Sequence, residues 1–167
     1  MVIQTMVDVV SKNGNYLLNI PVRGNGTIDE LGRKVVEEVG SWMNLNSESI
    51  YDTRPWKKFG EGPSVENQAK LTAQGFNEGK TKFTSQDVRF NIKGEILYAT
   101  IMAWPENNKA IIKSLRSGNP DFIKPIQKAE WLGGKQSLEF TQTAEGLEII
   151  FPGKIEVENY ANLLKIV

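Results

Sequence analysis

The sequence predicts a mainly β protein, an antiparallel two-sheet β-sandwich preceded by a helix–strand–helix unit of the α/β type. Two observations support this prediction. Before about residue 50 the apolar residues follow helical spacing with one short strand between the helices, and after it short apolar runs are separated by Gly, Pro and Asn. The 167 residues suffice for one domain and part of another. We therefore divide the chain into an α/β segment (1–50), a linker (51–67) and a sandwich (68–167).

The first segment begins with a predicted helix over residues 2–12, where Asn13-Gly14 supplies a left-handed stop. The run YLLNI at 16–20 is apolar on both faces, which is typical of a strand inside a parallel sheet covered by helices. A single strand of this kind cannot bury both faces by itself, so we expect its neighbours to lie upstream of Met1.

The strongest helix signal follows. Thr27 and Glu30 form the Thr-x-x-Glu pattern of a capping box, which predicts a helix beginning at Thr27. Apolar residues then recur at steps of three and four, ending at Trp42, and form one helix face. Beyond it, residues 53–67 contain two prolines and two glycines, which favours a linker.

The remaining chain predicts a sandwich of six or seven strands. VRFNIK at 88–93 alternates cleanly, and a Lys-Gly-Glu turn leads into ILYATIMA at 96–103, which predicts a hairpin. Further strand candidates are 110–115, 126–132, 138–143, 147–151 and 162–167. Many short strands with short turns and no helical period indicate two packed sheets.

Composition excludes several classes of function. The chain has no cysteine and no histidine, which removes disulfides, thiolate zinc sites and imidazole catalysis. Lys plus Arg equals Asp plus Glu at 20 each, without the basic excess typical of nucleic-acid binding. We expect no nucleic-acid partner, no membrane span, no signal peptide, no metal and no cofactor. Nothing in the sequence gives the compartment.

Few residues are candidates for a site. Trp104 and Trp131 end predicted strands and are candidate sugar contacts, although packing explains most tryptophans. GFNEGKT at 75–81 imitates a phosphate-binding loop but lacks its spacing, and Asn25-Gly26-Thr27 is a glycosylation sequon that also suits a turn. Carboxylates are the remaining catalytic groups, and no pair of them is placed convincingly. The acids nearest to possible domain edges are Asp8, Asp29, Glu48, Asp52 and Glu106.

Taken together, these segments resemble a known family. SKNGN at 11–15, the apolar run ending Asn19-Ile20, the Gly-Thr-Ile turn at 26–28 and IYDTRPW at 50–56 are similar to the end of the catalytic barrel of α-L-fucosidases, the family 29 glycoside hydrolases. Asp52 stands where that family usually has glycine. FTSQDVRF, the following hairpin and the closing strands resemble the family's carboxy-terminal β-sandwich.

The resemblance implies a retaining exo-hydrolase that removes terminal α-L-fucose from glycans with an Asp nucleophile and a Glu acid/base. None of the motifs that carry those groups is in this chain, so we assign it no catalytic residue. Residues 1–50 would be the end of the barrel, and the chain would be an inactive, structural carboxy-terminal fragment of a fucosidase whose partner is a fucosylated glycan. Two alternatives are a stand-alone carbohydrate-binding module and a structural or assembly domain. Since 2–12 and 16–20 present apolar faces, we also expect self-association or docking through the amino-terminal third.

Overall fold

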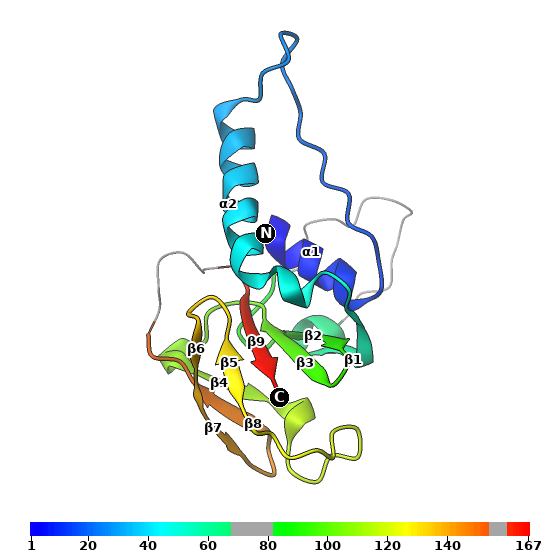
Figure 1. The fold of residues 1–167 in the computed structure, drawn as a ribbon, viewed down its shortest axis with the longest axis vertical. Helices are drawn as coiled ribbons and strands as arrows, with labels where there is room; N and C mark the ends of the chain where they lie inside the picture. Colours follow the sequence, from blue (N-terminus) through cyan, green and yellow to red (C-terminus); the bar gives the residue numbers. More distant parts are fainter. Residues whose placement is uncertain (68–81, 154–159) are drawn as a thin grey trace.

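The computed structural model describes residues 1–67, 82–153 and 160–167, and the phosphate-loop imitation at 75–81 lies outside them. In these described ranges nine strands form a β-sandwich body, and an arm made of an extended segment and a helix rises from it (Figure 1). The arrangement has three layers. Helices cover one face of a six-stranded sheet, and a three-stranded sheet covers the other.

The larger sheet has the strand order β1-β2-β3-β9-β5-β6, and all its pairs are antiparallel. Its strands are β1 (Arg54–Glu61), β2 (Val88–Lys93), β3 (Ile96–Ile101), β9 (Asn162–Ile166), β5 (Ala129–Trp131) and β6 (Gln136–Ser137). The predicted hairpin is confirmed, because β2 and β3 pair in unbroken register from Val88 opposite Ile101 to Lys93 opposite Ile96. The hairpin and β9 form the centre of the sheet.

The smaller sheet has the order β4-β8-β7, built from β4 (Lys109–Ile112), β8 (Leu147–Ile150) and β7 (Glu139–Gln142). Short 3-10 turns η2 (Glu106–Asn108) and η3 (Lys113–Leu115) flank β4. The mainly β fold class and its two-sheet sandwich are confirmed by this topology.

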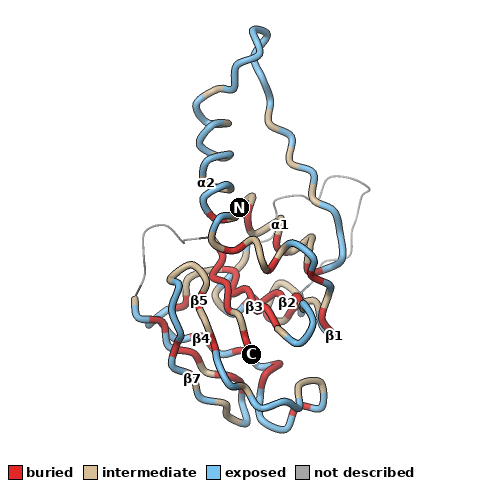
Figure 2. The backbone as a smooth tube through the Cα atoms, in the orientation of Figure 1, coloured by how far each residue is buried: buried red, intermediate tan, exposed pale blue. Residues whose placement is uncertain are grey.

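Two apolar clusters hold the layers together (Figure 2). The first lies between the sheets and includes Phe90, Ile112, Trp131 and Leu147, each at most 1% exposed. The second lies on the opposite face of the large sheet, where α1 (Val2–Ser11) and the end of α2 (Glu30–Asn46) pack on β3 and β9. The large sheet is therefore buried on both faces.

Helix α1 packs on the sandwich, which corrects the expectation that its apolar face lacks partners. Ile3 and Val7 are 3% and 2% exposed in the second cluster. The Gln4 side-chain amide also donates to the Met102 carbonyl at 2.6 Å. The sandwich itself therefore buries the apolar stripe of this helix.

The predicted strand at 16–20 is wrong for this chain. Residues 15–21 run extended without joining either sheet, and Leu17 is 91% exposed. A β-strand needs a hydrogen-bonded neighbour, and the described residues place no strand beside this one. Just beyond this segment, a bridge pairs Val22 with Ile28 at the tip of the arm (Figure 1).

The predicted start of the second helix is also corrected. Helix α2 begins at Glu30, not Thr27, because the Asp29 carboxylate caps it by accepting from the Gly32 amide at 2.7 Å. Thr27 instead donates its amide and hydroxyl to the Asn25 side chain in the preceding turn.

Residues 51–67 are not simply a linker. Within them β1 pairs with β2 at the sheet edge, and α3 (Pro63–Glu66) follows. The register shifts between Pro55 and Gly60, so the edge strand is bulged. A bulged edge strand tolerates proline and glycine, so β1 can contain Pro55 and Gly60. These two residue types favour a loop prediction from the sequence, which explains why this strand was not predicted. The division of the chain into domains at these positions stays a prediction.

Candidate functional site

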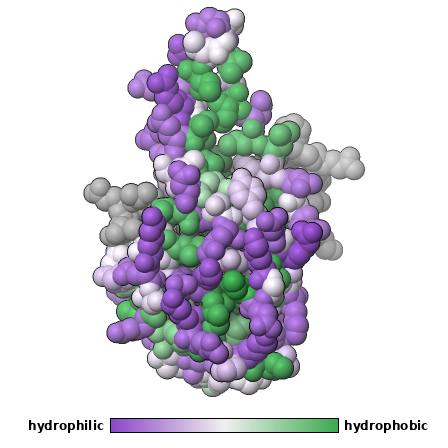
Figure 3. Space-filling view, viewed as in Figure 1, coloured by the Kyte–Doolittle hydropathy of each residue, from purple (hydrophilic) through white to green (hydrophobic). Residues whose placement is uncertain are grey.

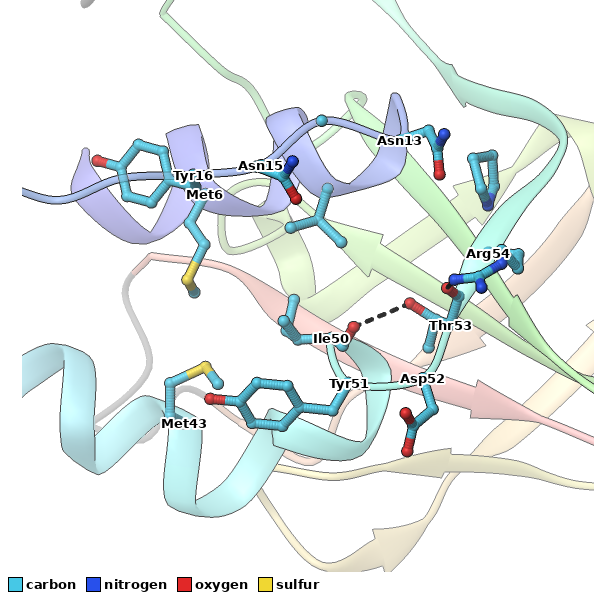
Figure 4. A pocket seen from close by; sticks show the side chains of 13 residues that line it. Met6, Asn13, Asn15, Tyr16, Met43, Ile50, Tyr51, Asp52, Thr53 and Arg54 are labelled. Atoms are coloured by element: carbon cyan, nitrogen blue, oxygen red, sulfur yellow. Dashed lines mark hydrogen bonds between the residues drawn. The ribbon is translucent and has the colours of Figure 1, made fainter.

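A pocket of about 420 Å³ opens where the arm meets the sandwich (Figure 4). Three segments line it. They are one side of α1, the turn after it at 13–16, and residues 50–55, which follow η1 (Ser47–Ser49) and include the start of β1. Met43 of α2 completes the lining. The first and last of these segments lie some forty residues apart in sequence. The same segments contain most of the residues on which the family resemblance rests, SKNGN and IYDTRP.

The pocket has an apolar end and a polar end. Met6 and Met43 lie at one end beside the rings of Tyr16 and Tyr51 (Figure 4). The other end is lined by the amides of Asn13 and Asn15 and by Arg54, which donates to the Thr53 carbonyl at 3.1 Å. The arrangement suits a small molecule that has both an apolar surface and hydroxyl groups.

Two lining residues have left-handed backbones. Asn13 has φ 63° and ends the turn after α1, and Asp52 has φ 59°. Asp52 occupies the position where the resembled family usually has glycine, the residue for which this conformation carries no steric cost. An aspartate there keeps a less favourable backbone that the surrounding structure must hold in place.

Beside this pocket lies a buried ion pair that the sequence analysis missed. Arg89 on β2 is 2% exposed and donates from Nε to the Asp8 carboxylate of α1 at 2.6 Å. Its Nη2 donates to the Ser64 hydroxyl at 2.7 Å, and its guanidinium lies 5.6 Å and 5.3 Å from the ring centroids of Phe59 and Phe83. Strand alternation puts Arg89 on the face opposite Val88, Phe90 and Ile92, and no sequence signal shows that α1 covers that face.

A second buried carboxylate ties the loop before β2 to α3. Asp87 is fully buried and accepts from the Ser64 amide at 2.7 Å and from the Thr84 amide and hydroxyl at 2.8 Å and 2.9 Å. Burial works to raise the pKa of Asp87, but the bonds from Ser64 and Thr84 outweigh it and hold that pKa below its usual value. The carboxylate is therefore a structural anion.

The acids singled out in the sequence do not come together as a catalytic pair. Asp8 is paired with Arg89, and Asp29 caps α2. Glu48 binds Lys165 at 3.0 Å, and Asp52 lies 3.5 Å from Lys93. The fifth, Glu106, lines a separate pocket of about 320 Å³ that also holds Glu61 and Glu66. Each of the first four is engaged in a structural contact.

The two tryptophan candidates differ in how far they are buried. Trp131 is 1% exposed and meets Trp104 and Phe151 edge-on at centroid distances of 5.5 Å, so neither of its faces is open to a sugar. Trp104 is half-buried in the same cluster and donates from its indole N–H to the Asn108 side chain at 2.9 Å. Its role as a sugar contact stays a prediction.

Neither a metal cluster nor a membrane helix is found in the part of the chain that the structure describes. Groups of three or more His, Cys, Asp or Glu side chains suited to a metal ion do not occur among residues 1–67, 82–153 and 160–167. Over the same ranges, every helix is too short or too polar to cross a bilayer.

Comparison with known proteins decides the family. The family model described as the alpha-L-fucosidase C-terminal domain matches residues 80–167, more than half of the chain. The chain belongs to the α-L-fucosidase family. A second model, described as alpha-L-fucosidase, matches residues 1–48, so both the arm and the sandwich have fucosidase counterparts. The fucosidase resemblance read from the sequence is thereby confirmed.

Relatives show how much of a fucosidase this chain represents. The tissue alpha-L-fucosidase of Mus musculus is 30% identical over 152 residues, and that of Bos taurus is 31% identical over 157 residues. Each alignment covers 90% of this chain but only 28% and 26% of the relative. The chain thus spans under a third of the length of these relatives.

Solved structures show the same fold. The alpha-fucosidase of Thermotoga maritima superposes with a TM-score of 0.71 at 24% identity, covering 99% of this chain and 33% of that one. Isoenzyme 1 from Paenibacillus thiaminolyticus gives a TM-score of 0.68 at 23% identity, covering 99% of this chain and 33% of that one. The arm and the sandwich therefore occur together in the fold of larger fucosidases.

Proposed function

We propose that this chain forms the carboxy-terminal part of a retaining exo-α-L-fucosidase that removes terminal fucose from glycans. In this proposal the sandwich supports the catalytic barrel, and residues 1–50 are the end of that barrel. The chain itself carries no nucleophile and no acid/base. The observation that carries the proposal is the tandem match, with a fucosidase model at 1–48 and the family's carboxy-terminal domain model at 80–167.

The chemistry of the described residues supports an accessory role. Retaining glycoside hydrolysis needs two carboxyl groups about 5 Å apart across an open cleft. Asp8 and Asp29 are instead held in an ion pair and a helix cap. Acids committed to such contacts are not available to attack or protonate a sugar.

The exposed surface of the arm supports docking onto another body. Apolar side chains gather over α2 and the extended segment on the visible face of the arm (Figure 3). The large apolar residues most exposed there are Leu17 at 91%, Leu31 at 78% and Val22 at 64%. Contiguous apolar surface of this kind favours association, so the arm would pack against the rest of the catalytic barrel, or against a second copy when that part is missing.

Activity tests the first part of the proposal. The purified chain is incubated with an aryl α-L-fucoside, beside the Thermotoga maritima relative as a positive control. We expect no release of the aryl group above buffer. Saturable turnover by this chain would overthrow the assignment of the catalytic groups to another part of the protein.

Self-association tests the docking surface. Sedimentation velocity of the chain should show association that grows with concentration. Leu17→Asp should shift it toward monomer, because a charge in an apolar interface must be desolvated. Ile123→Asp is the matched control, since Ile123 is an aliphatic residue 84% exposed on the sandwich, away from the arm. A wild-type chain that is monomeric at every concentration, or equal effects of the two variants, would contradict docking through the arm.

A further inference from the structure

We infer that Asn25, at the tip of the arm, is a site of spontaneous deamidation, in which the Gly26 amide nitrogen displaces ammonia from the Asn25 side chain. The proposed function gives no role to the turn that these residues form with Thr27. The reaction needs neither a sugar nor a catalytic barrel, so it goes beyond that function and does not depend on it.

The reaction joins the Asn25 side chain to the backbone that follows it. The Gly26 amide nitrogen loses its proton and bonds to the Asn25 Cγ, the bond from Cγ to Nδ2 breaks, and Nδ2 leaves as ammonia with that proton. Water then opens the cyclic imide at either of its carbonyl carbons and leaves an aspartate or an isoaspartate, each with one new carboxylate. Glycine favours the first step, because it has no side chain to obstruct the ring.

Two donors converge on the oxygen that takes up charge in the first step. The Asn25 Oδ1 accepts from the Thr27 amide at 3.1 Å and from the Thr27 hydroxyl at 2.7 Å. When the nitrogen adds to Cγ, the electron pair of the side-chain carbonyl moves onto this Oδ1. Donors already placed where negative charge develops lower the barrier of such an addition. The turn therefore favours the reaction at Asn25.

The tip also has room for the imide ring. Asn25 and Gly26 are exposed. In the described part of the chain, a Cβ added at Gly24 or at Gly26 would meet nothing within 4 Å beyond its chain neighbours. One bond opposes the reaction, because the Gly26 amide donates to the Arg23 carbonyl at 2.8 Å. This bond lies in an exposed turn, where local opening costs little free energy.

Asn13-Gly14 is the other Asn-Gly pair of the sequence, and its surroundings differ. Among the described residues no donor meets the Asn13 side-chain carbonyl. The Gly14 amide donates to the Val9 carbonyl at 2.9 Å, which holds the pair against the end of α1. A Cβ at Gly14 would come within 2.8 Å of the Val9 side chain, so this turn is crowded. We therefore expect Asn13 to react more slowly than Asn25.

The product changes the charge of the arm tip. The chain has equal numbers of acidic and basic residues, so one deamidation gives it a net negative charge. The new carboxylate would lie in the turn that is closed by the bridge between Val22 and Ile28, which are 64% and 39% exposed. A charge there opposes packing against an apolar partner, because it must be desolvated. This effect depends on the docking proposed above, whereas the reaction at Asn25 does not.

Peptide mapping by mass spectrometry measures both sites in one dilute sample of the folded chain, aged in mildly alkaline buffer. Trypsin separates the sites, because cleavage after Lys12, Arg23 and Arg33 puts Asn13 in peptide 13–23 and Asn25 in peptide 24–33. In the folded chain Asn25 should deamidate at least about tenfold faster than Asn13, the effect of its two donors on the barrier. Concentrated urea removes the turn but keeps both Asn-Gly pairs, so there the two rates should become similar.

Two variants of Thr27 test the donors. Thr27→Val keeps the branched shape without the hydroxyl and should slow the reaction at Asn25 about fivefold, the effect of one hydrogen bond on a barrier. Thr27→Ser keeps the hydroxyl and should restore most of the wild-type rate, while Asn13 keeps its rate in both variants. Equal rates at Asn25 and Asn13 in the folded chain, an advantage of Asn25 that persists in urea, or equal rates in Thr27→Val and Thr27→Ser would overturn the inference.

Discussion

Removing the Asp8 charge tests how α1 is held on the sandwich. In Asp8→Asn the side chain keeps its shape, but the Arg89 guanidinium, 2% exposed, loses its counter-charge. At a separation of 2.6 Å and an effective dielectric constant of 20, the attraction amounts to about 6 kcal/mol before desolvation is subtracted. Breaking one side of a buried pair costs about 3–5 kcal/mol.

The structure places Asp8→Asn at the lower end of that range. The Asp8 side chain is 19% exposed and also binds Lys12 at 2.8 Å, so water and a neighbouring cation already screen the pair. Arg89 keeps two other hydrogen bonds in the variant, because Nη2 donates to the Ser64 hydroxyl and Nη1 donates to the Val88 carbonyl. We therefore expect a loss of about 3 kcal/mol in the free energy of unfolding, a large share of the 5–15 kcal/mol typical of a domain.

Urea unfolding followed by tryptophan fluorescence measures this loss, and a double-mutant cycle with Arg89→Met isolates the pair. Asp121→Asn is the matched control, because the Lys57–Asp121 pair is exposed and lies 3.8 Å apart. That control should change stability by no more than about 1 kcal/mol. Equal effects of Asp8→Asn and Asp121→Asn would refute the buried pair as the link between α1 and the sandwich.

Three further predictions concern pH and backbone. Burial and the nearby Glu48 carboxylate raise the pKa of Tyr98 to about 12. The neutral phenol therefore stabilises the fold fully below about pH 10, and this stabilisation is lost as the pH rises toward 12. Tyr98→Phe should remove about 2–3 kcal/mol of this alkaline dependence in urea titrations at pH 9 and 12. Because the pKa of Asp87 is lowered in the fold, its carboxylate stabilises the fold above the usual aspartate pKa, and this stabilisation is lost as the pH falls through the lowered value. Asp87→Asn should therefore weaken the dependence of the melting temperature on acid pH and lower the free energy of unfolding by about 1–3 kcal/mol at neutral pH. Gly62 has φ 104° and its Cβ would collide with the Gln86 carbonyl, so Gly62→Ala should lower the unfolding free energy by at least about 2 kcal/mol, whereas an unchanged melting temperature would contradict the strain.

The sandwich could be predicted from the sequence because its signals are local. The alternation of Val88, Phe90 and Ile92 and the turn at Gly94 define a hairpin without help from distant residues, and the structure has it in register. The intervening Arg89 and Asn91 lie on the opposite face of the strand, yet they are only 2% and 6% exposed. They are buried because α1 and the 47–53 stretch cover that face, which is a long-range event without a local signal.

The extended segment of the arm could not be predicted from its local sequence. The apolar run at 16–20 has the composition of a buried strand, but strand formation depends on a neighbour as well as on composition. Leu17 therefore remains 91% exposed in a segment outside both sheets. The pocket could not be predicted from either half of its lining alone, since Asn15 and Tyr51 are distant in sequence and line one pocket only in the folded chain.

The same contrast explains the tryptophans. Position at the end of a strand made Trp104 and Trp131 equivalent candidates in the sequence. In the structure Trp131 fills the space between the sheets, and a Cβ at Gly134 would collide with its ring. Burial of this kind depends on which sheet lies opposite, and the sequence does not reveal that.

Hydrogen exchange of the isolated chain tests the central claim most directly, namely that α1 is packed on the sandwich while the extended segment of the arm is not. At concentrations where the chain is monomeric, amides of α1 and of β3 should exchange slowly, and amides at 17–21 should exchange close to the rate of an unstructured peptide. Slow exchange at 17–21 in the monomer, or fast exchange throughout α1, would contradict the account.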